Sequence, residues 1–432
     1  METFKPGVVY ETPRGPNARG YLDRKGLIHA HSVYSHDACD DMPVKDGVRD
    51  ATCFDDFRRG LCQTKHDFVM LTDHAESFRD TEFPEILLYR AERGDQLIER
   101  GGSSVASWAA CPGQGPVLVM AGMESGVMPV GVERHLLPLE ERAYYTQSSS
   151  RARALHRQAG AVVLAQHTEN WSPEELASEG FDGFEMYNLH ANMRGGAGQL
   201  VALAVYISDQ RPGLPMPDLV VLPLWNEDPI YLGTWGSVLA RGAKRVTTMA
   251  TDCHQNTFRA VLEDGERVDS YRRMMAWLAN HLLVRPGPDG RFDDLSLKEA
   301  LRAGRLYGVL EAAGYAEGFD FYAEGSGEVV EMGGVAAVGA RLIVRRPAVK
   351  GLDPKKRAPL LTVRLLRARE GGFEEVASSS EGDLQFQPSA PGAYRAEVVM
   401  VPWHLSEELR DFWLAVYEKK LVWVYSNPIY IE

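Results

Sequence analysis

Histidines and carboxylates at the ends of apolar runs are the residues of this sequence best suited to chemistry. His29 and His31 form an HxH pair in GLIHAHSVYSHDA, and His36 and Asp37 follow shortly after. Residues two apart on a strand point to the same side, so both imidazoles of the pair can reach one metal ion. The spacing therefore predicts a metal site that begins at the end of this strand.

Comparable residues recur at five later positions. They are Asp73 and His74 in LTDHAE, Glu124 in VLVMAGMES, His135, His167 in AVVLAQH, and Asp252 with His254 in ATDCHQ. All except His135 follow the end of an apolar run, and in barrels built from βα units the carboxyl ends of the strands carry the active site. A single strand-end residue usually has a capping role, so it is the coincidence of these clusters that predicts a shared site.

Imidazole and carboxylate ligands together suit Zn, Mn or Fe, and the lack of convergent cysteines argues against a zinc finger. Eight or nine ligands are too many for one ion, so we expect two or three divalent metal ions. Such a site can activate water and stabilise a leaving group, which indicates a metal-dependent hydrolase. The alternative is a binding module in which metals only hold the fold together, and the full ligand set argues against it.

Other catalytic templates are missing from the sequence. There is no GxSxG elbow, no GxxxxGK[ST] loop and no strand followed by GxGxxG. Cys253 lies between two predicted ligands, but strand alternation points its side chain away from them. We therefore expect Cys253 to pack in the core and not to act as a nucleophile.

The elements that must position these residues alternate between strands and helices. Predicted strands cover 27–31, 68–73, 117–124, 135–139, 161–167, 181–188 and 246–252, and helix-like spacing covers 55–65, 85–100 and 198–210. This alternation predicts an α/β fold with a mainly parallel sheet, and about seven such units favour a barrel. Residues 1–20, rich in Pro and Gly, are expected to form an extended arm, followed by the metallohydrolase barrel over 21–312.

The remainder, 313–432, has the pattern of a separate β-rich domain. Predicted strands cover 319–323, 340–345, 360–366, 384–387, 394–401 and 421–431, separated by Gly and Pro turns, with one amphipathic helix over 407–420. This pattern predicts an antiparallel β-sandwich. Its single histidine, His404, is expected to pack or cap a helix and to bind no metal.

Composition narrows the function classes further. The apolar fraction is 44%, and the net charge of -13 makes binding to nucleic acid or an anionic membrane unfavourable. No apolar run is long enough to span a membrane, and no secretory signal is visible. The five cysteines are odd in number and never form a CxxC pair, so we expect no disulfide framework and a cytoplasmic location.

The motifs HAHSVYSHD, LTDH, GMES, His135, AQH and TDCH, in this order over residues 26–260, resemble the polymerase and histidinol phosphatase (PHP) superfamily. The tail, with the closing WVYSNPIYI, is similar to the carbaryl-hydrolase-like branch of metallohydrolases. The resemblance implies a distorted (β/α)7 barrel with a trinuclear metal site. EMYN (185–188) also looks like a family strand, with Glu185 supporting a ligand.

Carried over residue by residue, the resemblance implies three ligand sets. The first is His29, His31, Glu124 and Asp252; the second is Glu124, His135 and His167; the third is His74, His254 and either His36 or Asp37. Asp73 is expected to orient a ligand. Glu124 and His254 are also assigned to the catalytic set.

The expected substrate is a small anionic phosphoester, because most members of the superfamily cleave phosphoesters. Arg134 and Arg194 flank the predicted site segments and are candidate phosphate-binding residues of the catalytic set. Trp171 is expected either to form an apolar wall or to pack at the rim. A carboxyl- or carbamate-ester hydrolase on the same site is the alternative reading.

Overall fold

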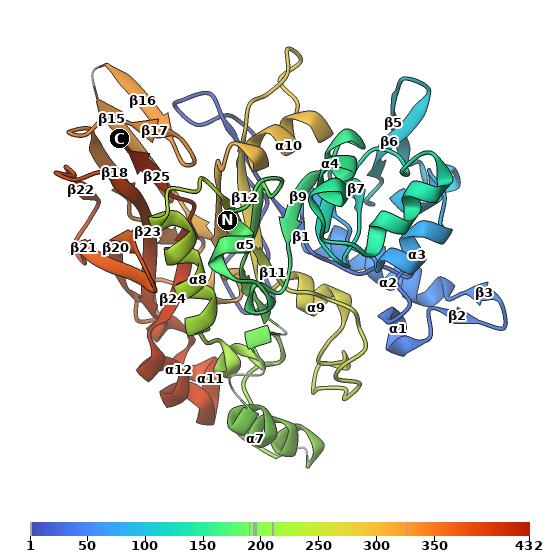
Figure 1. Ribbon diagram of the computed structural model, residues 1–432. Coiled ribbons are helices and arrows are strands. Elements are labelled where there is room, and N and C mark those ends of the chain that lie inside the picture. Colours follow the sequence, from blue (N-terminus) through green and yellow to red (C-terminus); the bar gives the residue numbers. More distant parts are fainter. Residues whose placement is uncertain (1, 190, 193–196, 210, 326) are drawn as a thin grey trace.

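The computed structural model describes residues 2–189, 191–192, 197–209, 211–325 and 327–432 (Figure 1). Seven strands lead to the predicted site: β1 (Leu22–Ile28), β4 (Phe68–Met70), β7 (Val117–Gly122), β8 (Met128–Val132), β9 (Val162–Ala165), β10 (Gly183–Asn188) and β11 (Val246–Ala250). Four neighbouring pairs are parallel, namely β1–β4, β4–β7, β9–β10 and β10–β11, whereas β8 is antiparallel to both β7 and β9.

The two ends of this series meet at one point. A single parallel bridge joins Ala30, just after β1, to Cys253, just after β11. On its other side β1 pairs with the antiparallel strand β12 (Ala279–Val284), which pairs with β13 (Leu306–Val309). The α/β class is confirmed as a large mixed sheet with helices, and the closed seven-stranded barrel of PHP type stays a prediction.

The strands that carry the site are short and apolar because they are covered on both faces. Every residue of β4, β7 and β9 is buried, as is typical of parallel strands enclosed by helices. Helix α2 (Ala51–Gln63) is one of the covering helices, and Phe54 and Phe57 lie on its buried face. Asp50 caps its amino end by accepting hydrogen bonds from the amides of Thr52 and Cys53.

Further helices are α3 (Ala75–Asp80), α4 (Ser150–Gln158), α5 (Pro173–Ala177), α7 (Ala197–Ser208), α8 (Pro229–Ala240), α9 (Tyr271–Met275) and α10 (Asp294–Arg302). The helices predicted over 55–65 and 198–210 correspond to α2 and α7. The helix predicted over 85–100 is wrong. Two short 3-10 turns and strand β5 (Gln96–Arg100) occupy that range, and β5 forms a hairpin with β6 (Ser103–Ala109). Gly94, with φ 84°, ends the second turn, and its left-handed conformation interrupts a helix.

The strand predicted over 135–139 is also wrong. The strand lies upstream as β8, in a run that contains Pro129 and Gly131. Pro and Gly usually indicate turns, so the sequence pattern of this run does not look like a strand. Residues 139–146 instead form a 3-10 helix.

Besides a short antiparallel pair of β14 (Ala316–Glu317) and β19 (Ala348–Val349), the tail contains two larger antiparallel sheets. One consists of β20 (Leu360–Arg369), β21 (Gly372–Ser379), β23 (Gly392–Val401), β24 (Leu421–Ser426) and β25 (Ile429–Ile431), and the other of β16 (Glu328–Glu331), β15 (Asp320–Gly325), β18 (Arg341–Arg345) and β22 (Leu384–Phe386). Buried residues of both sheets belong to one hydrophobic cluster with residues of the first part of the chain. Because β24 pairs with β13, the first tail sheet continues the main sheet.

The helix predicted over 407–420 is interrupted. Helix α11 (Ser406–Leu409) and helix α12 (Trp413–Lys419) are separated by a 3-10 turn that begins at Arg410, whose φ is 50°. The amino-terminal arm contains no helix or strand over residues 2–20, as expected for an extended segment. It packs on the tail, since Arg19 forms ion pairs with Asp320 and Glu331.

The expectation of no disulfides is wrong. Cys39 is bonded to Cys53 and Cys62 to Cys111, whereas Cys253 is free and buried as expected. The partners are 14 and 49 residues apart, so only the fold reveals the pairing. Disulfides are typical of oxidising compartments, which removes the cysteine argument for a cytoplasmic location. Among the described residues, no helix is both long and apolar enough to cross a membrane.

Candidate metal centre

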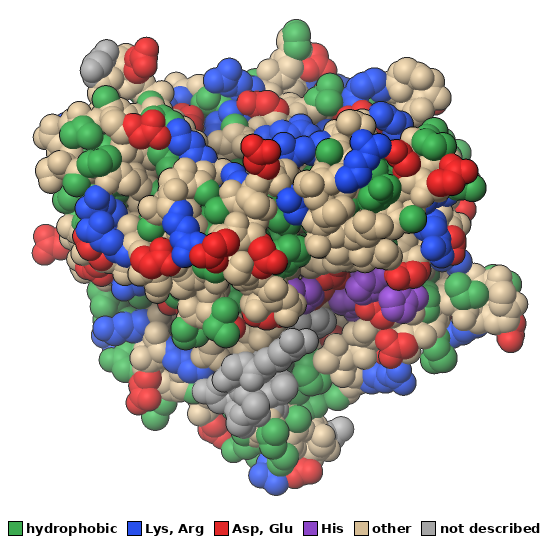
Figure 2. Space-filling model, in the orientation of Figure 1, with side chains coloured by type: hydrophobic (Ala, Val, Ile, Leu, Met, Phe, Trp, Pro, Cys, Tyr) green, Lys and Arg blue, Asp and Glu red, His purple; other side chains and the backbone are tan. Residues whose placement is uncertain are grey.

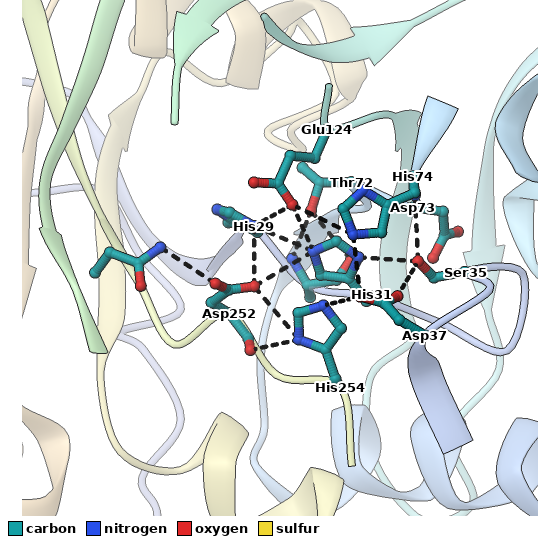
Figure 3. A network of polar contacts seen from close by, with 12 residues as sticks. His29, His31, Ser35, Asp37, Thr72, Asp73, His74, Glu124, Asp252 and His254 are labelled. Carbon is teal, nitrogen blue, oxygen red and sulfur yellow. Dashed lines mark hydrogen bonds and ion pairs between the residues drawn. The ribbon is translucent and has the colours of Figure 1, made fainter. Parts of the chain in front are cut away.

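The predicted ligands converge because parallel strands end at the same edge. His29 and His31 follow β1, His74 follows β4 and Glu124 follows β7, while Asp252 and His254 follow β11. Figure 3 shows these side chains pointing toward one another from separate loops. Two parallel bridges, Ala30 to Cys253 and His74 to Glu124, fix the loops relative to each other.

Three of these residues have an unusual backbone. His29, His167 and Asp252 have φ values of 83°, 48° and 53°, in the left-handed region that residues with a Cβ rarely occupy. Each stands directly after its strand or one residue beyond it. Backbone strain of this kind is concentrated at functional sites, where it directs a side chain into a pocket.

The first ligand group is His29, His31, Glu124 and Asp252, all buried, whose ligand atoms lie within 4.8 Å of one another. Nε2 of His29 lies 3.3 Å from Oε2 of Glu124 and 3.1 Å from Oδ1 of Asp252. Nε2 of His31 lies 3.2 Å and 3.3 Å from the same two oxygens. Two imidazoles and two carboxylates thus face one point, which is the donor set of a Zn, Mn or Fe site.

The second group is Asp37, His74 and His254, with His31 at its border, and its atoms satisfy the same 4.8 Å limit. Oδ2 of Asp37 lies 3.0 Å from Nε2 of His74 and 3.1 Å from Nε2 of His254. His36 is exposed and contributes only a ring contact with His74. The structure therefore favours Asp37 over His36 as the third ligand.

The two carboxylate oxygens of Glu124 face different histidines. Its Oε2 faces His29 and His31, and its Oε1 lies 2.9 Å from Nε2 of His167. His167 is also 3.5 Å from Glu169 through Nδ1, and Glu169 accepts a hydrogen bond from the Tyr231 hydroxyl. Glu124 and His167 thus form a smaller pair beside the first group.

His135, expected as a ligand beside His167, is not in either group. Its ring nitrogens lie 2.9 Å from the Tyr145 hydroxyl and 2.9 Å from the Thr81 carbonyl oxygen, and its ring packs edge-on against Phe78. His135 is therefore a buried packing residue. The strand expected to carry it lies upstream as β8.

Of the two candidate arginines, only Arg134 belongs to the described residues. Arg134 is exposed, and its guanidinium donates to the carbonyl of Gln158 at the end of α4. Arg194 lies outside the described residues. Arg134 thus faces solvent beside a helix end, and its phosphate-binding role stays a prediction.

The metal groups open into a cavity of about 700 Å³. Figure 2 shows histidines at the floor of a hollow in the surface. Its described lining residues are Asp37, His74, Glu124, Ser125, Gly126, Ser148, Gln166, His167, Asn170, Trp171, Glu175, Asp252 and His254. No lysine or arginine is among them. Trp171 lies in the wall, where its indole N–H donates to the Gln166 carbonyl.

Charge in the site is strongly coupled. Burial alone would lower the pKa of His29, but Asp252, Glu185 and Glu124 outweigh it and raise that pKa well above its usual value. The same balance raises the pKa of His254 to about 9 and that of His167 to about 10. Burial would raise the pKa of Glu124, but His29 and His167 hold it well below its usual range. The carboxylate of Glu124 thus stays ionised and attracts cations.

Several buried residues orient the ligands. Glu185 lies 2.5 Å from Nδ1 of His29, as expected for a supporting residue. Asp73 accepts from the amide and the hydroxyl of Ser32, next to His31, and its orienting role stays a prediction. Ser35, whose hydroxyl donates to Asp37 at 2.7 Å, was not predicted from the sequence. The one signal that could have identified it is a polar residue two positions before Asp37.

Comparison with known proteins gives no match: no family model fits the chain, and no curated protein or solved structure is significantly similar to it. The resemblance to the PHP superfamily therefore rests on the motifs quoted above.

Proposed function

We propose that this protein is a metal-dependent hydrolase that acts on ester bonds at the site formed by His29, His31, Asp37, His74, Glu124, Asp252 and His254. The observation that carries the proposal is that two groups of ligand atoms, each within 4.8 Å, share one cavity of about 700 Å³. A purely structural metal site has no need of such an opening, since closed coordination is typical of structural metals.

The donor chemistry fits divalent Zn, Mn or Fe. Such cations activate water for attack and polarise the scissile group when they are bound. His29, His31, Glu124 and Asp252 would hold one cation, and Asp37, His74 and His254 would hold the other. A third cation would have to bind between Glu124 and His167, where His135 is missing.

The chain itself supplies charge and orientation. Glu124 places a negative charge between the two groups, which offsets the repulsion between neighbouring cations. Glu185 and Ser35 fix the orientation of His29 and Asp37 through the hydrogen bonds described above. His167, partly exposed to the cavity, lies where a substrate would enter.

A phosphoester is the first substrate class that we propose, on the basis of the resemblance to the PHP superfamily. One observation favours the second candidate, a carboxyl or carbamate ester. The described cavity wall offers no lysine or arginine to a phosphate, and Trp171 offers an apolar surface to a neutral group. Cationic donors are the usual partners of phosphate oxygens.

The test is metal analysis followed by a substrate screen. Gently purified protein should contain more than one equivalent of Zn, Mn or Fe. The metal-loaded protein is then offered aryl phosphomonoesters, phosphodiesters, carboxyl esters and carbamates. Turnover of any class that Glu124→Gln abolishes and Glu175→Gln leaves intact supports the proposal, because Glu175 is an exposed acid of the same cavity. Protein with one metal ion or none would contradict it.

A further inference from the structure

The segment that presents Asp37 has a strained backbone. The three residues Cys39, Asp40 and Asp41 have φ values of 58°, 59° and 62°. In the left-handed region Cβ crowds the following carbonyl oxygen, so residues other than glycine, Asp included, enter it occasionally, and then as single residues and not in succession. A run of three persists only when surrounding interactions hold it. The ties that hold this run therefore decide where the carboxylate of Asp37 lies.

Noncovalent ties join the run to the loop of His254. The amide of Cys39 donates to the carbonyl of His254 at 3.1 Å, and the amide of Asp40 donates to the carbonyl of Gln255 at 3.0 Å. The side chain of Asp40 also pairs with Arg267 at 2.8 Å. The segment thus lies directly against a loop that carries another metal ligand.

The covalent tie is the disulfide between Cys39 and Cys53, which connects the run to the first turn of α2. Both cysteines are buried. Sγ of Cys53 is 3.9 Å from the hydroxyl of Tyr271, and this hydroxyl lies 3.0 Å and 3.1 Å from the carbonyl oxygens of His31 and His254. The disulfide therefore reaches from the Asp37 segment into the contacts that fix two ligand-bearing loops.

We propose that the Cys39–Cys53 disulfide positions Asp37 as a metal ligand, so that cation binding by Asp37, His74 and His254 depends on the oxidation state of this cysteine pair. The inference rests on the proposed function for the presence of a cation. What it adds is the role of the Cys39–Cys53 disulfide. In the other group, His29, Glu124 and Asp252 lie at strand ends away from this disulfide, and the described link to it is the backbone carbonyl of His31, through the hydroxyl of Tyr271.

The redox step is a thiol–disulfide exchange. A dithiol reductant attacks the bond between the two sulfurs, supplies two electrons and two protons, and leaves as its own disulfide, while Cys39 and Cys53 become thiols. Freed of its covalent tie, the run of left-handed residues relaxes and carries the Asp37 carboxylate away from His74 and His254.

The second disulfide offers a matched control. It joins Cys62 to Cys111, and Cys62 lies on the same helix α2 as Cys53. Cys62, however, lines a different cavity together with Asp67 and Pro116. Removing either disulfide removes one covalent link to α2, but only the Cys39–Cys53 link holds the segment of a proposed metal ligand, Asp37.

The experiment compares Zn²⁺ titrations of metal-free wild type, Cys39→Ala/Cys53→Ala and Cys62→Ala/Cys111→Ala. We expect the first variant to bind one Zn²⁺ normally and the other about 10- to 100-fold more weakly, the range found when a supporting contact of a metal ligand is lost. The second variant should bind both as wild type does. Equal affinities in all three proteins, or an equal loss in both variants, would overturn the proposal.

Hydrogen exchange keeps the test informative if metal binding or folding fails. In metal-free Cys62→Ala/Cys111→Ala protein the only remaining disulfide is Cys39–Cys53, so a dithiol reductant acts on it alone. The amides of residues 38–42 should then exchange faster on reduction, with those of β4 and β7 unchanged. Unchanged exchange at 38–42 contradicts the inference, whereas wild type that binds no Zn²⁺ in either redox state contradicts the proposed function.

Discussion

The carboxylate of Glu185 lies 2.5 Å from Nδ1 of His29. This contact leaves Nε2 of the imidazole for the centre of the site, where it lies 3.1 Å from Asp252. An imidazole in this arrangement is fixed both in rotation and in the nitrogen that it presents, as is common for histidine ligands of metals.

Glu185→Gln should weaken cation binding by the His29 group about 10- to 100-fold, because the amide replaces a charged partner of the imidazole with a neutral one. The second group should keep its affinity, since the ligand side chain that Glu185 orients is that of His29. Zn²⁺ titration with two resolved binding steps measures both. An unchanged first step would show that Glu185 has only a packing role.

Asp37 and His36 form a natural pair for substitution. Asp37→Asn should lose the cation held with His74 and His254 and reduce turnover at least tenfold, because the amide lacks the charge that draws both imidazoles together. His36→Asn should keep full metal content, because the side chain of His36 is exposed. Metal analysis of the two variants decides this, and loss of metal in His36→Asn alone would reverse the assignment.

Glu124→Gln keeps the size of the side chain and removes its charge. We expect loss of the cation of the first group and of turnover, with the Asp37 group largely retained. Circular dichroism should match wild type, because the apolar strands β4, β7 and β9 form the core here. Near-normal metal content and activity would mean that Glu124 is only a strand-end carboxylate.

His404→Ala should leave metal content unchanged. The ring is buried, and its Nε2 donates to the Ala313 carbonyl at 2.9 Å, far along the chain from any ligand segment. Burial lowers the pKa of His404 to about 4, so the ring is neutral at pH 7. Its loss should lower the free energy of unfolding by about 1–3 kcal/mol. Denaturant unfolding and metal analysis of one preparation test both parts together.

Stability should fall in alkaline solution because of His281. This buried histidine lies 2.9 Å from Asp23 and 3.3 Å from Glu311. Burial disfavours its charge, but the two carboxylates raise its pKa to about 9. A pKa raised on folding stabilises the protein below the unfolded value, near 6.5, and that stabilisation is lost as the pH rises through 9.

The expected loss is on the order of 3 kcal/mol between pH 6 and 10. His281→Gln should be less stable than wild type at pH 6 and should show a flatter dependence over this range. Urea unfolding at both pH values, with disulfides intact, supplies the comparison. Parallel pH profiles for the two proteins would contradict the assignment.

The strand-end candidate ligands could be proposed from the sequence because two local signals coincide in them, an apolar run and a polar residue after it. His29, His74, Glu124, His167 and Asp252 all have this form. Asp37 and His36 are adjacent in a loop, where no periodicity separates them, and only the backbone conformation does so. His135 was misassigned because Pro129 and Gly131 hid the strand before it.

The cysteine pairs were missed for a different reason. Spacing patterns reveal disulfides only in small cysteine-rich frameworks, whereas here Cys62 and Cys111 meet because α2 packs beside the end of β6. The α/β class, by contrast, follows from the alternation of short apolar runs with amphipathic stretches.

The left-handed backbone at His29, His167 and Asp252 has a consequence for how this chain tolerates mutation. At each of the three positions glycine would relieve the strain of a Cβ in that conformation. The replacement that removes a ligand is therefore also one that relaxes the backbone. A laboratory selection for thermal resistance alone would drift toward such replacements and erase the site, so a library built from this scaffold has to be screened for bound metal as well as for survival on heating.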